Sequence, residues 1–278
     1  MAATTHLPAP ARPAGLPAPT GRAGFGGAVR SELTKIRSVR STYWTLLALV
    51  IVTVGIGALA CLGAVSHGGD VRGPGFDPTF HSLVGLVLGQ LIIVVLGSLT
   101  ITSEYATGMV RTSLSVQPRR GTLFAAKAVV FAVVSLVTGL VASFASFFLG
   151  QAILSSKHLG TTLGQPHVLR AVIGGGLFLA VCGLLAFGLG AILRHTAAAI
   201  TASIGLLFVL FILTNFLPQS WQNHVDKWIP FNAGSQIWTT AADPGSHMFS
   251  AWTGFAVFAA YAAIAIAAGF ALFRNRDA

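Results

Sequence analysis

Apolar residues gather into six long runs, which lie near residues 43–65, 82–102, 128–154, 171–193, 197–217 and 250–273. None of these runs contains an aspartate, glutamate, lysine or arginine. About 20 apolar residues are enough for a helix to cross a bilayer, and each run reaches that length. The runs lack the alternating polar and apolar positions of a membrane β-barrel. The pattern therefore predicts an all-α integral membrane protein with six transmembrane helices.

The composition supports this prediction. Of 278 residues, 54% are hydrophobic and 9% are charged, and the mean hydropathy is +0.78. A soluble domain carries about 25% charged residues, so an ordinary cytosolic enzyme is excluded. Cys61 and Cys182 lie inside two different apolar runs, and we expect no disulfide between them.

Basic residues are distributed unevenly between the loops. If the amino terminus is cytoplasmic, 13 of the 17 lysines and arginines fall on the cytoplasmic side. The four external cations are then matched by four external aspartates, and the whole net charge of +10 lies inside. Lysine and arginine accumulate on the cytoplasmic side of membrane proteins, so the charge pattern predicts that both termini are cytoplasmic. Topology accounts for the basic charge, and we expect no nucleic-acid partner.

Two segments precede the first apolar run. Residues 1–24 are rich in proline, alanine and glycine, and we expect a disordered cytoplasmic tail. In residues 25–41, four apolar residues recur at helical spacing: Phe25, Val29, Leu33 and Ile36. Basic side chains occupy its other faces: Arg30, Lys35 and Arg37. This pattern favours a helix lying in the inner membrane interface, although a solvated juxtamembrane segment would also fit.

The loop after the second run carries the most informative pattern. Glu104 is its only acidic residue, and Gly108 permits a bend or a close approach. Apolar residues give a short helix one apolar side, and Pro118 ends that helix before Arg119. A short helix of this kind between two spans is suited to dock on another protein. A simple cytoplasmic anchor would explain the arginines but not the ordered glutamate, glycine and proline.

Two motifs carry a resemblance to a known family. One is the run Ser31-Glu-Leu-Thr-Lys-Ile-Arg before the first span. The other comprises Glu104, Tyr105, Gly108, Arg111, Thr112, Leu114, Pro118, Arg119 and Lys127. Over residues 28–275 the chain resembles a permease subunit of the ABC-2 class of ATP-binding cassette transporters, whose transmembrane domain is of the type V exporter kind.

The resemblance implies a role for each segment. Residues 25–41 would be a connecting helix, and residues 42–274 would form the six-helix transmembrane domain. Residues 104–120 would supply the coupling helix that sits in a cleft of an ATPase subunit, and the loop 218–249 would dip into the outer leaflet. Coupling to the partner would rest on Glu104, Tyr105, Gly108, Arg111, Thr112, Leu114, Pro118 and Arg119.

The resemblance also implies a function. The chain would be the permease of an exporter in a prokaryotic plasma membrane, paired with a second permease as a homodimer or heterodimer and with two ATPases. ATP and magnesium would bind to the partner ATPase, with no cofactor on this chain. Consistent with this, the sequence has no phosphate-binding loop of the form G-x-x-x-x-G-K-[ST], so we expect no enzymatic activity of its own. The six runs also lack the ionisable groups typical of ion-driven transporters.

Polar and aromatic residues within the runs indicate a path for cargo only weakly. Candidates are Gln90, Phe208, Phe211 and Asn215, which would suit hydrophobic or amphipathic cargo such as a drug, antibiotic, lipid or peptide. Most such residues in membrane helices serve helix packing instead. The glycines of Gly85-x-x-x-Gly89 and of the run 174–176 favour close helix contacts. Six external histidines lack metal-ligand spacing, and we expect no metal site.

Two further interpretations remain open. The last external loop carries tryptophans and other large residues that favour a position at the outer leaflet: Trp221, Trp228, Pro230, Phe231, Trp238 and Trp252. As an alternative to transport, the chain could be a membrane signalling or scaffold module that binds an ATPase through the same loop. A membrane-embedded enzyme is disfavoured because no ionisable catalytic group lies within the runs.

Overall fold

The computed structural model describes residues 24–66, 76–106, 120–240 and 247–275, and these residues form helices and loops without strands. Within them, six helices are long and apolar enough to cross a membrane: Arg40–Ser66, Pro78–Ala106, Arg120–Ser155, Val168–Leu193, Thr196–Thr214 and Ala251–Asn275. These six helices correspond one to one with the predicted runs. The prediction of an all-α protein with six candidate membrane spans is confirmed.

The first half of the chain contributes helices α1 (Phe25–Ser38), α2 (Arg40–Ser66), α3 (Pro78–Leu83), α4 (Leu86–Ala106) and α6 (Arg120–Ser155). The second half contributes α7 (Val168–Leu193), α8 (Thr196–Ile204), the π-helix η2 (Gly205–Val209), α9 (Leu210–Thr214), α10 (Gln219–Val225), η3 (Asp226–Trp228), α11 (Pro230–Ser235) and α12 (Ala251–Asn275). Together α3 and α4 make the second span, while α8, η2 and α9 make the fifth.

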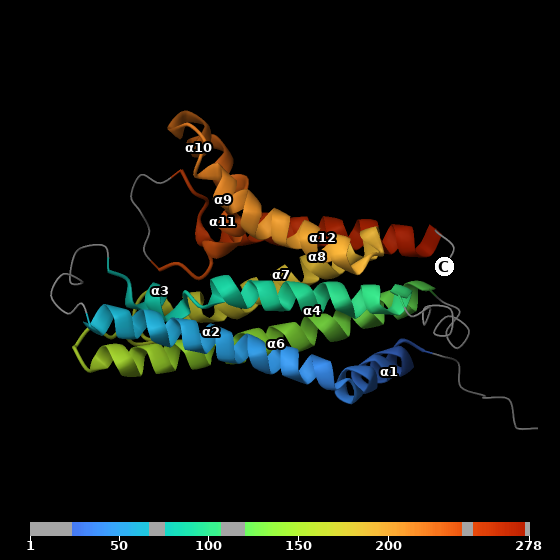
Figure 1. The fold of residues 1–278 in the computed structure, drawn as a ribbon, viewed down its shortest axis with the longest axis horizontal. Coiled ribbons are helices and arrows are strands. Elements are labelled where there is room, and N and C mark those ends of the chain that lie inside the picture. Colours follow the sequence, from blue (N-terminus) through green and yellow to red (C-terminus); the bar gives the residue numbers. More distant parts are fainter. Residues whose placement is uncertain (1–23, 67–75, 107–119, 241–246, 276–278) are drawn as a thin grey trace, which may run out of the picture.

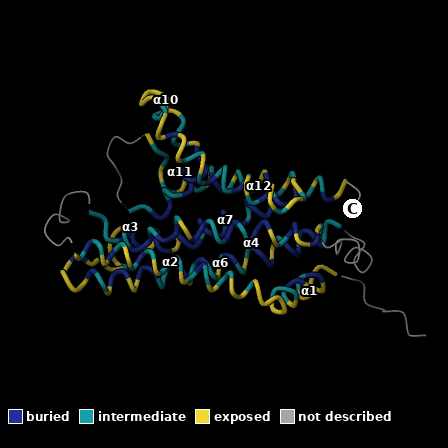
Figure 2. Tube along the Cα trace, in the orientation of Figure 1, coloured by how far each residue is buried: buried dark blue, intermediate teal, exposed yellow. Residues whose placement is uncertain are grey.

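Helix α7 lies at the centre of the bundle, where it packs against α4, α6 and α12 (Figures 1 and 2). Its aromatic side chains meet those of the neighbouring helices: Phe187 packs on Phe124 and Phe131, and Phe178 packs on Phe258. All five rings are nearly or fully buried. The core of the protein is therefore built around the fourth span.

Glycines let the spans approach closely. A Cβ at Gly85 would overlap the Thr53 carbonyl of α2, and a Cβ at Gly97 would overlap the Gly183 carbonyl of α7. In the run 174–176, a Cβ at Gly176 would lie 2.6 Å from the Leu140 side chain of α6. Small residues bring helix backbones together in this way in membranes. Both predictions of close glycine packing are confirmed.

The two ends of the bundle differ in what they carry. Helix α1 and the last residues of α12 lie at one end, which we call the terminal end (Figure 1). Helices α3, α10 and α11 lie toward the opposite end, which we call the far end (Figure 1). The prediction that the terminal end is cytoplasmic stays a prediction, as does the tail predicted over residues 1–24, of which 1–23 lie outside the described residues.

The segment predicted as one helix over 25–41 is divided. Helix α1 ends at Ser38, Val39 takes an extended conformation, and Arg40 already begins α2. The predicted apolar stripe of α1 is not its most buried face, since the two buried residues of the helix are Ala28 and Glu32. The break at Val39 therefore lets α1 leave the direction of α2 and pack on α6.

Part of the far-end segment after α9 is buried against the bundle. Trp238 is 2% exposed and packs between Phe80 and Phe178, and Phe231 packs on Phe178 and Phe211. Pro230, Phe231 and Trp238 are therefore buried within the protein, and the prediction that this loop lies at the outer leaflet stays a prediction. Three tryptophans do remain exposed: Trp221, Trp228 and Trp252.

Candidate coupling site

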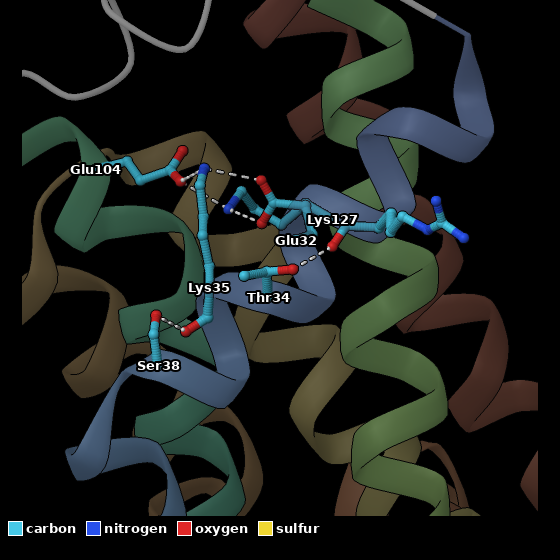
Figure 3. Close-up of polar contacts among 7 residues, drawn as sticks. Glu32, Thr34, Lys35, Ser38, Glu104 and Lys127 are labelled. Atoms are coloured by element: carbon cyan, nitrogen blue, oxygen red, sulfur yellow. Dashed lines mark hydrogen bonds and ion pairs between the residues drawn. The ribbon is translucent and has the colours of Figure 1, made fainter.

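Four charged side chains meet at the terminal end, and we call them the charge quartet: Glu32, Lys35, Glu104 and Lys127 (Figure 3). Helix α1 supplies the first two, which lie three residues apart and so share a face. Glu104 lies in the last turn of α4, and Lys127 follows the start of α6 by about two turns. The quartet thus joins three helices that are distant in sequence.

The charges alternate around a ring. Lys127 Nζ lies 2.6 Å from Glu32 Oε2 and 2.8 Å from Glu104 Oε1. Lys35 Nζ lies 2.9 Å from Glu32 Oε1 and 3.0 Å from Glu104 Oε1. Each ammonium group therefore donates to both carboxylates, and the four formal charges sum to zero. Hydrogen bonds between ionised groups are among the strongest side-chain contacts.

Burial makes these contacts depend on one another. The side chains of Glu32 and Lys127 are 4% and 5% exposed, that of Glu104 is 9% exposed, and that of Lys35 is 33% exposed. A buried charge is costly unless an opposite charge and hydrogen bonds compensate for its lost hydration. Burial opposes the charge of Lys35, but the hydrogen bond with Glu32 and the charge of Glu104 outweigh it and raise the pKa of Lys35.

Tyr105 attaches the same end of α4 to two other helices. Its ring meets the Phe273 ring of α12 edge to face, with centroids 6.4 Å apart. The Arg194 guanidinium lies 5.1 Å from the centre of the Tyr105 ring, and its Nη2 donates to the Leu272 carbonyl of α12. Arg194 ends α7 in the left-handed conformation. Glu104 and Tyr105 therefore hold the end of α4 from two sides.

The other coupling residues fall in the segment 107–119, which lies outside the described residues: Gly108, Arg111, Thr112, Leu114, Pro118 and Arg119. Their assignment stays a prediction. The described chain stops at Ala106 and resumes at Arg120, and these residues belong to α4 and α6. The charge quartet therefore includes a residue from each of the two helices that flank the predicted coupling segment, Glu104 of α4 and Lys127 of α6.

The sequence pattern predicts a coupling role for Glu104, whereas Glu32, Lys35 and Lys127 enter it only as members of the family motifs and, for Lys35, as a basic residue of the segment 25–41. A signal was present, because Glu32 and Glu104 are the only acidic residues before residue 277 on the side assigned to the cytoplasm. Two isolated carboxylates among many cations are expected to find basic partners. Which lysines they find depends on how α1, α4 and α6 pack.

The four cargo-path candidates lie in two parts of the bundle. Gln90 on α4 is fully buried, and its Oε1 lies 3.9 Å from Cys182 Sγ of α7. On the fifth span, Phe208 is half-buried, Phe211 packs on Phe231, and Asn215 is exposed and donates to the Phe211 carbonyl. A cargo path along these residues stays a prediction.

Among the described residues, no group of three or more histidine, cysteine, aspartate or glutamate side chains is placed to hold a metal ion. Comparison with curated proteins finds no significant match. A family model described as ABC-2 family transporter protein matches residues 36–278, which is most of the chain and includes all six candidate spans. Membrane domains of this kind act as transporter permeases that work with an ATPase subunit. With its six apolar helices and this match, the chain belongs to the ABC-2 transporter permease family.

Proposed function

We propose that this chain is the membrane subunit of an ABC exporter, driven by a separate ATPase that docks on residues 104–120. In this proposal the terminal end is cytoplasmic and the membrane is a prokaryotic plasma membrane. A second permease, identical or related, completes the transporter. ATP and magnesium bind to the ATPase dimer, and this chain performs no hydrolysis.

The charge quartet is the observation that carries the proposal. The segment 107–119 connects α4 to α6, and the quartet joins those two helices to each other and to α1. A displacement of the docked segment would therefore move the ends of three helices together. Because α4 and α6 both pack on the central α7, that movement would reach the core of the bundle.

The cargo class follows from the character of the spans. Helix α4 carries one charged residue, Glu104, and helix α6 carries two, Arg120 and Lys127. All three lie near the terminal end, and the remaining side chains of both helices are uncharged. A path lined by such residues suits hydrophobic or amphipathic molecules better than small ions. Gln90, Phe208, Phe211 and Asn215 remain the candidate lining.

Reconstitution with the partner ATPase tests the proposal. The full-length chain, with the ATPase that copurifies with it, is placed in liposomes, and ATP hydrolysis and efflux of a lipophilic dye are measured together. We expect Arg111→Gln and Glu104→Gln to lower the dye transported per ATP, because they weaken the docking segment and its attachment to the helices. Arg274→Gln, which removes an exposed charge from the last turn of α12, is the matched control.

Two results would contradict the proposal. Unchanged transport per ATP in both Arg111→Gln and Glu104→Gln would remove the coupling role of this segment. If the ATPase binds the chain but lipophilic cargo never stimulates hydrolysis, the signalling or scaffold alternative would replace transport.

A further inference from the structure

Helix α1 presents three different faces. With about 100° between successive residues of a helix, Ala28, Glu32 and Lys35 share one face. The predicted apolar stripe lies beside it: Phe25, Val29, Leu33 and Ile36. Arg30 and Arg37 are seven residues apart and lie together on the other side of that stripe.

Burial agrees with this division. Ala28 and Glu32 are buried, and Lys35 is half-buried where it joins the charge quartet. Arg30 and Arg37 are both exposed. Val29, Leu33 and Ile36 are half-buried, so the stripe separates a face packed on the bundle from a row of exposed arginines.

The start of α2 continues the basic row into the membrane-spanning part. Arg40 is exposed, and Tyr43 and Trp44 in the next turn are 54% and 69% exposed. Exposed apolar side chains follow, beginning with Leu47 and Ile51. A change from arginine to tyrosine and tryptophan and then to aliphatic residues is typical of a helix leaving the headgroup region of a bilayer.

The charges of Arg30, Arg37 and Arg40 are not compensated by any carboxylate that the structure describes. The quartet already engages Glu32 and Glu104, the two described carboxylates at the terminal end. The surface therefore combines exposed guanidinium groups, exposed aromatic rings and an apolar stripe.

We propose that Arg30, Arg37 and Arg40, which we call the arginine row, bind the phosphate groups of anionic phospholipids in the leaflet at the terminal end. A guanidinium group donates two parallel hydrogen bonds to a phosphate, and Trp44 and Tyr43 lie at the depth of the headgroups. Each arginine near an anionic bilayer contributes roughly fivefold to the affinity. The inference does not depend on transport or on the partner ATPase.

Lipid titration of the purified full-length chain tests the proposal. The chain in detergent micelles is titrated with phosphatidylglycerol or with phosphatidylcholine, and bound lipid is counted by native mass spectrometry. We expect phosphatidylglycerol to bind more tightly, and Arg37→Gln with Arg40→Gln together to weaken it about 25-fold. Arg37→Lys with Arg40→Lys should retain most of the binding.

The control is the pair Lys157→Gln and Lys227→Gln, which removes the same charge from the opposite end of the bundle, after α6 and in η3. We expect this pair to bind phosphatidylglycerol within about twofold of the unaltered chain. Equal affinity for the two lipids, or an equal loss in the control, would overturn the proposal. If the arginine variant bound lipid normally but lost its ATPase, the row would instead be a protein interface. Should that variant not fold, Arg30→Gln with Arg37→Gln is measured against the same criteria.

Discussion

Replacing Lys127 by methionine tests whether the charge quartet acts as a unit. Lys127 Nζ donates to Glu32 at 2.6 Å and to Glu104 at 2.8 Å, and its side chain is 5% exposed. Methionine keeps much of the length and volume of lysine but removes the charge. The substitution leaves two buried carboxylates that share Lys35, and the formal charge of the cluster changes from zero to −1.

The expected cost follows from that imbalance. Removing one partner of a buried ion pair costs about 3–5 kcal/mol, because the other charge stays buried without compensation. Lys35 still neutralises one carboxylate, so we expect the lower end, about 3 kcal/mol, or roughly a hundredfold in the unfolding equilibrium constant. Adding Glu104→Gln restores neutrality and leaves the Glu32–Lys35 pair. This second change should recover about 1–2 kcal/mol.

Unfolding of the purified chain in mixed micelles by increasing SDS measures these differences. Arg274→Met removes an exposed charge at the same end of the bundle, and we expect it to change stability by less than about 0.5 kcal/mol. The reasoning is refuted if Lys127→Met costs no more than this control. It is also refuted if the double variant is less stable than Lys127→Met alone, because the four charges would then not compensate one another.

Three more predictions use the same unfolding measurement. A Cβ at Gly85 would overlap a carbonyl of α2, so Gly85→Ala should destabilise by about 1–3 kcal/mol, whereas Gly55→Ala, with no neighbour within 4 Å, should not. The pKa of Lys35 is raised in the folded protein, so the charge of Lys35 contributes fully to the free energy of unfolding below its usual pKa of 10.5, and that contribution is lost as pH rises through the folded pKa. The difference in stability between the unaltered chain and Lys35→Met should therefore shrink only above pH 10.5. A difference that shrinks between pH 7 and 9 would contradict this prediction. Asp77 caps α3 and accepts from Thr240, so Asp77→Ala should cost about 1–2 kcal/mol, and a cost no larger than that of Thr240→Val would exclude the capping role.

The spans could be predicted from the sequence because their signal is local. Twenty apolar residues in succession have few other stable environments, and each helix lies where its run lies. The helix ends were less accurate for a physical reason. The predicted second run stops at residue 102 and the third starts at residue 128, so Glu104 and Lys127 fall outside both. Paired charges let both helices continue, and α4 and α6 extend past them.

The site could be predicted only in part because its geometry is tertiary. A glutamate such as Glu32 on a short amphipathic helix is typical of a solvated face, and nothing in its neighbours along the chain indicates burial. Its burial depends on Lys127, 95 residues away, and on how closely α1 packs on α6. The same reason explains Trp238: an isolated tryptophan in a loop favours the membrane interface, until Phe80 and Phe178 enclose it.

The end of α4 contacts four other helices through two consecutive residues. The side chains of consecutive helical residues point about 100° apart, so Glu104 and Tyr105 contact different neighbouring helices. Glu104 joins α1 and α6 through charge, whereas Tyr105 joins α7 and α12 through Arg194 and Phe273. A helix end held only by one neighbour could fray or swing when the following segment is pulled. Held from both sides, the end of α4 moves only together with its neighbours, which is the property that the proposed coupling segment requires of α4.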